Sequence, residues 1–170
     1  MKEARTPEVL GELIEERASR LGDKIFLRFK DQNFTYRDMD RLSNRCANAF
    51  KGLGVTKGDT VSIMLANCPE FIHVWFGLAK IGAVEVPVNT SYKGEFLRHI
   101  VDQSDSKIFV IGAEFLDRLK LIEESLAKLK KVISQMYMSV ANEMTGKQFF
   151  DSPKLSKVIS DYKAFMGEKA

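Results

Sequence analysis

Residues 78–92, with the sequence LAKIGAVEVPVNTSY, constrain the fold more than any other segment of the chain. They join the end of an apolar helix, through Gly82, to a short apolar strand that closes on Pro87 and Asn89. The helix, which begins at Pro69, is apolar nearly all round, and such a helix is buried between layers. A buried helix followed directly by a buried strand predicts an α/β fold.

Short apolar strands alternate with helices along most of the chain. The pattern predicts strands at 61–65, 83–88, 107–111 and 131–134, separated by helices near 69–79, 93–103 and 114–129. Strands that are apolar on both faces are typical of a parallel sheet covered by helices. We therefore predict an α/β domain with a mostly parallel sheet, flanked by helices on both faces.

The first fifty residues predict a helix, a hairpin and a second helix. Thr6 and Pro7 have the residue types that open a helix, and Gly22 would end it. Residues 25–29 and 34–36 flank a turn at 30–33, which predicts a small β-hairpin outside the main sheet. Thr35 followed by Asp38 resembles a capping box for the helix that ends near Leu53.

The pattern changes after Met136. Residues 137–150 show no sustained period, whereas Ser152 and Pro153 would begin a helix with one apolar face. That face comprises Leu155, Val158, Ile159, Tyr162 and Phe165. Each large apolar side chain gains about 1.5 to 3 kcal/mol on burial, so we expect this helix to dock on the domain or on a partner region. The predicted division is an α/β subdomain at 1–136, then a loop and amphipathic helix at 137–170.

Composition excludes several classes of protein. The chain has 170 residues, 45% of them hydrophobic, which is enough for one core. Its net charge of +3 is spread along the sequence, so we expect no nucleic-acid partner. Charged residues interrupt the longest apolar stretch, at 71–88, and the N-terminus lacks the apolar core of a secretory signal. We expect no transmembrane segment.

Two glycine-containing segments are weak candidates for phosphate binding. Gly52, Gly54 and Gly58 approach a dinucleotide fingerprint, but they would close a helix rather than follow a strand and open one, which predicts a turn. Thr145, Gly146 and Lys147 lack the glycine and the Ser or Thr of a phosphate loop. Neither segment predicts a nucleotide site.

The histidines and cysteines offer few catalytic candidates. His73 lies in the most apolar helix, where a neutral buried imidazole is the simpler interpretation, and His99 fits an exposed helix surface. Cys46 fits an apolar packing role. Cys68 follows a strand at the edge where α/β folds bind ligands, although we favour a structural role. The two cysteines lack metal-site spacing, and we expect both to stay reduced in a cytoplasmic protein.

Two long segments resemble a known family. FTYRDMDRLSNRCANAF begins at Phe34, and KGDTVSIMLANCPEFIHVWFGLAKIGAVEVPVNTSYKGEFLRHIVDQSDSKIFVIG begins at Lys57. Together they resemble the N-terminal part of the AMP-forming acyl-CoA synthetases, in collinear order from about 6 to 133. Within this adenylate-forming superfamily, residues 67–89 are most similar to fatty acyl-CoA and crotonobetaine/carnitine-CoA ligases.

The resemblance implies an ATP-dependent ligase, an enzyme of fatty acid metabolism or a related pathway. In such a parent enzyme, a carboxylic acid such as a fatty acid or carnitine-like compound attacks Mg-ATP to give an acyl-adenylate and pyrophosphate. The thiol of coenzyme A then displaces AMP. ATP, Mg2+ and coenzyme A would therefore act in the parent enzyme, with none expected bound to this chain.

The family's catalytic motifs do not occur in this sequence. Family members have a Ser/Thr/Gly-rich phosphate loop, later acidic and Arg residues, and a mobile domain with a catalytic Lys. We therefore assign no catalytic, cofactor-binding or metal-binding residue, and we expect an inactive N-terminal fragment that self-associates through exposed apolar surface. The matched residues are architectural: Gly82 would allow close packing, while Pro87 and Asn89 would end the strand.

Two alternatives stay open. The chain could be a non-catalytic, stand-alone α/β module that binds a partner or a small ligand. It could also belong to another adenylate-forming branch, such as the luciferase-like enzymes or the adenylation domains of peptide synthetases.

Overall fold

The central element of the fold is a parallel four-stranded sheet. The computed structural model describes residues 9–122 and 131–133. The strands are β3 (Thr60–Met64), β4 (Val84–Pro87), β5 (Ile108–Ile111) and β6 (Lys131–Ile133). Their order is β4-β3-β5-β6, and every neighbouring pair is parallel. The predicted α/β class and parallel sheet are therefore confirmed.

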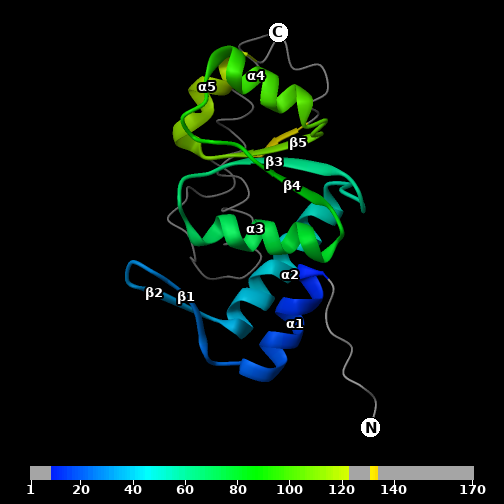
Figure 1. Ribbon diagram of the computed structural model, residues 1–170, viewed down its shortest axis with the longest axis vertical. Coiled ribbons are helices and arrows are strands. Elements are labelled where there is room, and N and C mark those ends of the chain that lie inside the picture. Colours follow the sequence, from blue (N-terminus) through cyan, green and yellow to red (C-terminus); the bar gives the residue numbers. More distant parts are fainter. Residues whose placement is uncertain (1–8, 123–130, 134–170) are drawn as a thin grey trace.

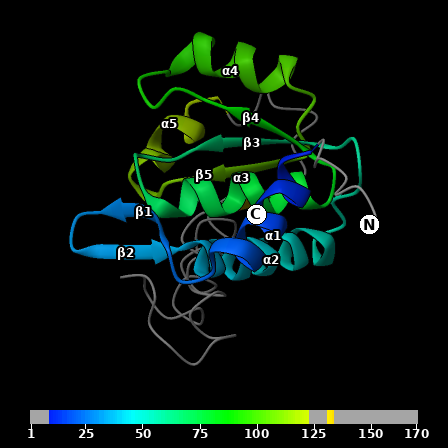
Figure 2. The ribbon, with the colours of Figure 1, turned by 60° about the horizontal axis from the view of Figure 1, so that its bottom comes forward.

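Helices cover both faces of this sheet (Figures 1 and 2). On one face α3 (Pro69–Lys80) packs with part of α2 (Tyr36–Gly52). On the other face lie α4 (Gly94–Gln103) and α5 (Leu116–Lys120), the latter preceded by a short 3-10 helix at Ala113–Phe115. Because strand side chains alternate, Ile63 and Val110 face α3, whereas Met64 and Phe109 face α4 and α5.

An N-terminal layer lies beyond α3, on the side away from the sheet (Figure 1). It contains α1 (Leu10–Leu21), α2 and a hairpin of β1 (Ile25–Phe29) and β2 (Gln32–Thr35). Ile14, Met39 and Phe76 form its buried core, one from each of the three helices. The hairpin forms a separate two-stranded sheet, as predicted.

Capping explains where α2 begins. The Thr35 hydroxyl accepts a hydrogen bond from the Asp38 amide at 3.1 Å, and the Asp38 carboxylate accepts one from the Thr35 amide at 3.1 Å. Burial alone would raise the pKa of Asp38, but these bonds and Arg41 outweigh it and lower that pKa. The predicted capping box is confirmed.

Several predicted boundaries were wrong. α1 begins at Leu10 with an extended Val9 at its N-cap, and Thr6 and Pro7 lie outside the described residues. The hairpin turn is shorter than predicted because Lys30 adopts a positive φ of 50°, so that β2 already starts at Gln32. Within residues 113–122, the helix predicted at 114–129 is a 3-10 turn followed by the short α5, and residues 123–129 lie outside the described residues.

The prediction that all strands are apolar on both faces fails at β4. Val84 is 49% exposed and Pro87 is exposed, because β4 is the outermost of the described strands on its side of the sheet. The loop predicted at 137–150 and the helix predicted near 152–165 lie outside the described residues. In the described part of the chain, every helix is too short or too polar to cross a bilayer.

Candidate functional site

The order of the strands places a topological switch point between β3 and β5. After β3 the chain enters α3 on one face of the sheet, and after β5 it enters α5 on the opposite face. In open α/β sheets, ligands bind outside the carboxyl ends of the strands at such a point. The residues that follow β3 and β5, notably Cys68 and Gly112, are therefore the candidate functional positions.

Cys68 is poorly suited to act as a nucleophile. It is the N-cap of α3, and Pro69 occupies the first turn, as the sequence predicted. Burial, followed by the nearby Glu70 carboxylate, raises the pKa of the Cys68 thiol to about 12. The thiol is thus protonated at neutral pH, which favours a structural role.

The loop after β5 contains a position that sequence reasoning missed. The Gly112 amide donates to the Met64 carbonyl at 2.9 Å, which ties this loop to the end of β3. A Cβ at Gly112 would lie 2.7 Å from the Glu114 carboxylate. The sequence signal that could have identified Gly112 is a glycine directly after a fully apolar strand. The Glu114 side chain is exposed beside it.

Pro87 and Asn89 end β4 as predicted. Pro87 is the last residue of the strand, in register with Ile63. The Asn89 side-chain oxygen accepts a hydrogen bond from the Ser91 amide at 2.8 Å, which forms a turn of the kind that Asn favours. Gly82, before the strand, has a φ of 71°, which glycine adopts without a Cβ penalty. These residues therefore shape the chain around the sheet.

His73 is a buried neutral imidazole, in agreement with the sequence interpretation. It is 2% exposed and makes an edge contact with Phe34, whose ring centroid lies 5.4 Å away. Burial, together with the charge of Arg41, lowers the pKa of His73 to about 4, although Asp38 acts in the opposite direction. Its Nε2 has no hydrogen-bond partner within the described structure. A histidine neutral under ordinary conditions and shielded from solvent is not placed to exchange protons with a substrate.

The remaining candidates have structural positions. Cys46 is 2% exposed in the core between α2, α3 and the sheet, and His99 is exposed on α4. Gly52 ends α2, and Gly54 and Gly58 each adopt a φ of 87° in the loop that precedes β3. The predicted turn is confirmed. Thr145, Gly146 and Lys147 lie outside the described residues.

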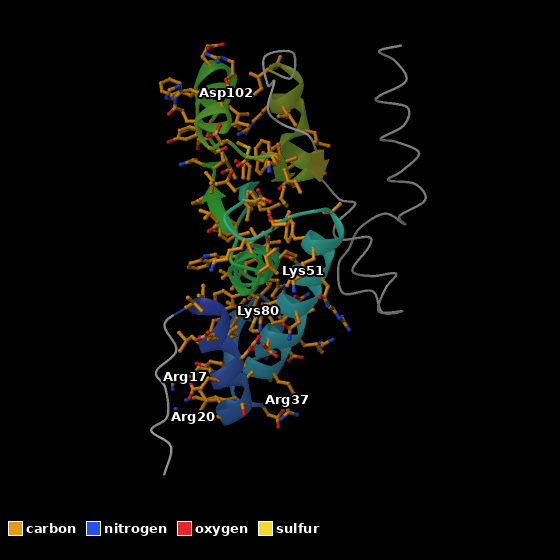
Figure 3. The ribbon with its side chains drawn as sticks, turned by 90° about the vertical axis from the view of Figure 1, so that its right-hand side faces the viewer. Arg17, Arg20, Arg37, Lys51, Lys80 and Asp102 are labelled. Atoms are coloured by element: carbon orange, nitrogen blue, oxygen red, sulfur yellow. The ribbon has the colours of Figure 1, made fainter. Side chains whose placement is uncertain are left out.

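Lys80 links three helices and was not singled out from the sequence. Its ammonium lies 2.6 Å from the Glu15 carboxylate of α1 and 2.7 Å from the Asp40 carboxylate of α2. The Lys80 side chain is only 5% exposed, at the level where α3 meets α1 and α2 (Figure 3). Gly11 allows this approach, since a Cβ there would lie 2.9 Å from the Lys80 Cα. We name Lys80, Glu15 and Asp40 the lysine clasp.

Asp59 is held by structural partners rather than in a catalytic arrangement. Asp59 accepts hydrogen bonds from the Thr56 amide and hydroxyl and from Lys107, and these lower its pKa to about 2. Within residues 9–122 and 131–133, no three His, Cys, Asp or Glu side chains are grouped to hold a metal ion. The described residues therefore form a structural scaffold, in which the carboxyl ends of the parallel strands lie at one edge of the sheet.

Comparison with known proteins gives a consistent assignment. The family model of the AMP-binding enzymes matches residues 14–162. The crotonobetaine/carnitine-CoA ligase of Salmonella paratyphi A is 39% identical over 120 residues, which cover 68% of this chain and 23% of that protein. The chain thus spans about a quarter of the length of the curated relative it matches.

Solved structures agree with the sequence comparison. The N-terminal domain of FACL13 from Mycobacterium tuberculosis superposes with a TM-score of 0.74 at 28% identity, covering 86% of this chain and 38% of that one. The anthranilate-CoA ligase AuaEII, solved with anthranoyl-AMP, superposes with a TM-score of 0.72 at 26% identity, covering 79% and 26%. Because the family model matches most of this chain, the chain belongs to the AMP-binding enzyme family.

Proposed function

We propose that this chain is the N-terminal part of an ATP-dependent acyl-CoA ligase. The observation that carries the proposal is the family match over residues 14–162, with relatives that are named as CoA ligases. The parent enzyme would join a carboxylate to ATP, release pyrophosphate, and transfer the acyl group from AMP to the thiol of coenzyme A.

The chain supplies the frame of that enzyme and not its reaction centre. Carboxylate and triphosphate repel each other, so their reaction needs a metal ion, cationic donors and backbone amides around the phosphates. The described residues do not fit a Mg-ATP site, because carboxylates such as Asp40 and Asp59 are already engaged by lysines of this chain. We therefore derive no chemical step from them, and we propose that the 170-residue chain alone is inactive.

An assay of pyrophosphate exchange into ATP tests whether the 170-residue chain is inactive without the rest of the parent enzyme. The 170-residue chain and the full-length parent are each incubated with ATP, Mg2+, labelled pyrophosphate and a carboxylate. We expect label to enter ATP only with the parent, since the frame lacks a phosphate loop. Exchange by the 170-residue chain at a rate near that of the parent would contradict the proposal.

The carboxylate is a fatty acid or a carnitine-like compound in this proposal, and the matched crotonobetaine/carnitine-CoA ligase supports the second. A panel of fatty acids of several lengths, crotonobetaine, carnitine and aromatic acids, tested on the parent, separates the branches. Preference for an aromatic acid would favour another branch, as the relative AuaEII acts on anthranilate. Cys46 and Cys68, both free thiols, support a cytoplasmic enzyme.

A stand-alone binding module is the second candidate. The switch point between β3 and β5 favours it, because such an edge can hold a ligand without the rest of the enzyme. A stop codon directly after Ala170, together with a stable monomer, would support this alternative. A coding sequence that continues into a Ser/Thr/Gly-rich loop with a Lys would support the ligase.

A further inference from the structure

The backbone of β4 forms ladder hydrogen bonds on one side. The Val84 amide donates to the Asp59 carbonyl at 2.8 Å, and the Val88 amide donates to the Ile63 carbonyl at 2.8 Å. A parallel ladder uses alternate residues, so the backbone groups of Val86 also point toward β3. The backbone groups of Glu85 and Pro87 therefore point the other way, at the outer edge of the described sheet.

This outer edge is poor in hydrogen-bond donors. A strand added there would need the amides of residues 83, 85 and 87. The Ala83 amide already donates to the Leu78 carbonyl at 3.0 Å, and Pro87 has no amide hydrogen. Within β4, Glu85 alone keeps an outward N–H. Proline is confined to such edges because it cannot donate to a ladder.

Glu85 adds an electrostatic obstacle. Its side chain is partly buried beside the edge, and its Oε1 atom has no hydrogen-bond partner among the described residues. Burial already raises the pKa of this carboxyl group. A strand added at this edge would cover more of a side chain that is already partly buried and whose Oε1 has no partner among the described residues, and charged residues on edge strands are a known protection against such pairing.

We propose that the outer edge of β4 is closed to β-strand partners, including a second copy of this chain. Self-association of the chain, where it occurs, then uses another surface than the β4 edge.

Amide exchange tests whether the edge is free in the 170-residue chain. We expect the Glu85 amide to exchange at least about a hundredfold faster than the amides of Val84 and Val86, because only the latter two lie in the ladder. NMR on the labelled protein resolves the three amides individually. Protection of Glu85 equal to that of Val86 would show a strand or another acceptor on this edge and would overturn the proposal.

The complementary test uses variants of β4 that should allow a strand to pair with its outer edge. The double variant Pro87→Val/Glu85→Thr restores a donor and removes the charge, whereas Glu85→Gln removes only the charge and serves as the control. Sedimentation velocity should show association of the double variant at about tenfold lower concentration than the wild type, with the Glu85→Gln control between the two. Circular dichroism and thermal melting verify that the variants are folded. A folded double variant with unchanged association, and with rapid exchange of the new amide at position 87, would contradict the proposal.

Discussion

The sheet and the N-terminal layer bury polar groups in different ways. On β3, the buried Ser62 hydroxyl donates to Ser106 at 2.9 Å and lies 3.1 Å from the Ser104 hydroxyl. Where α3 packs on the N-terminal layer, His73 Nε2 and the Ser43 hydroxyl are buried without a hydrogen-bond partner in the described structure. An unsatisfied buried polar group costs free energy, and a satisfied one does not. The interior of the sheet around β3 and β5 should therefore depend mainly on packing, whereas the contact between α3 and the N-terminal layer also depends on charge and pH.

The largest effect is expected where the sheet is packed. Phe109 is fully buried against α4 and α5, so Phe109→Ala should lower the free energy of unfolding by about 3 to 5 kcal/mol. Urea denaturation measures this change. Phe96→Ala is the control, since Phe96 is 76% exposed and its loss should change stability little. Equal losses in the two variants would show that the face covered by α4 and α5 is not the main core.

The N-terminal layer should respond to acid through His73. The pKa of His73 is about 4 when folded and near 6.5 when unfolded, so between these values the unfolded chain binds more protons. Stability is then full above pH 6.5, falls as the pH drops toward 4, and loses about 3 kcal/mol in all. Urea denaturation across this pH range measures the loss.

A matched pair of histidine variants isolates this effect. His73→Gln should flatten the pH dependence between 6.5 and 4, because the titrating group is removed. His99→Gln is the matched control, because it removes an exposed histidine on α4, outside the N-terminal layer. If the His99 variant flattens the profile instead, the acid sensitivity belongs to the region around α4 rather than to the N-terminal layer.

Close approach of helices gives a further contrast within the molecule. A Cβ at Gly77 would lie 2.5 Å from the Cys46 Cβ and 2.9 Å from the Ser43 carbonyl oxygen, so Gly77→Ala should destabilise by about 2 kcal/mol. Gly52 has no atom within 4 Å of such a Cβ, and Gly52→Ala should stabilise α2 by roughly 0.5 kcal/mol. The melting temperature should fall for Gly77→Ala and rise for Gly52→Ala. A shift of both melting temperatures in the same direction would contradict the close packing of α2 on α3.

Sequence patterns predicted the parts of the fold that depend on local chemistry. Apolar runs located the strands, and the Thr35 cap located the start of α2, because both are encoded by neighbouring residues. The positive φ of Lys30 and the exposure of Val84 were missed, since one depends on turn geometry and the other on strand order. The lysine clasp was missed because Glu15 and Lys80 are far apart in sequence.

The lysine clasp gives the smallest destabilisation expected from removing an interaction. Lys80→Met should destabilise by about 1 to 2 kcal/mol, less than a fully buried ion pair would, because the Asp40 and Glu15 side chains are 25% and 59% exposed and water solvates them once the ammonium is gone. Glu15→Gln should cost less than about 1 kcal/mol, since Asp40 still pairs with Lys80. Urea denaturation ranks the variants, and amide exchange in α1 should rise in both while exchange in β3 and β5 stays the same. A loss of protection in the sheet equal to that in α1 would mean that the layer and the sheet unfold as one unit, which would remove the distinction between the two regions.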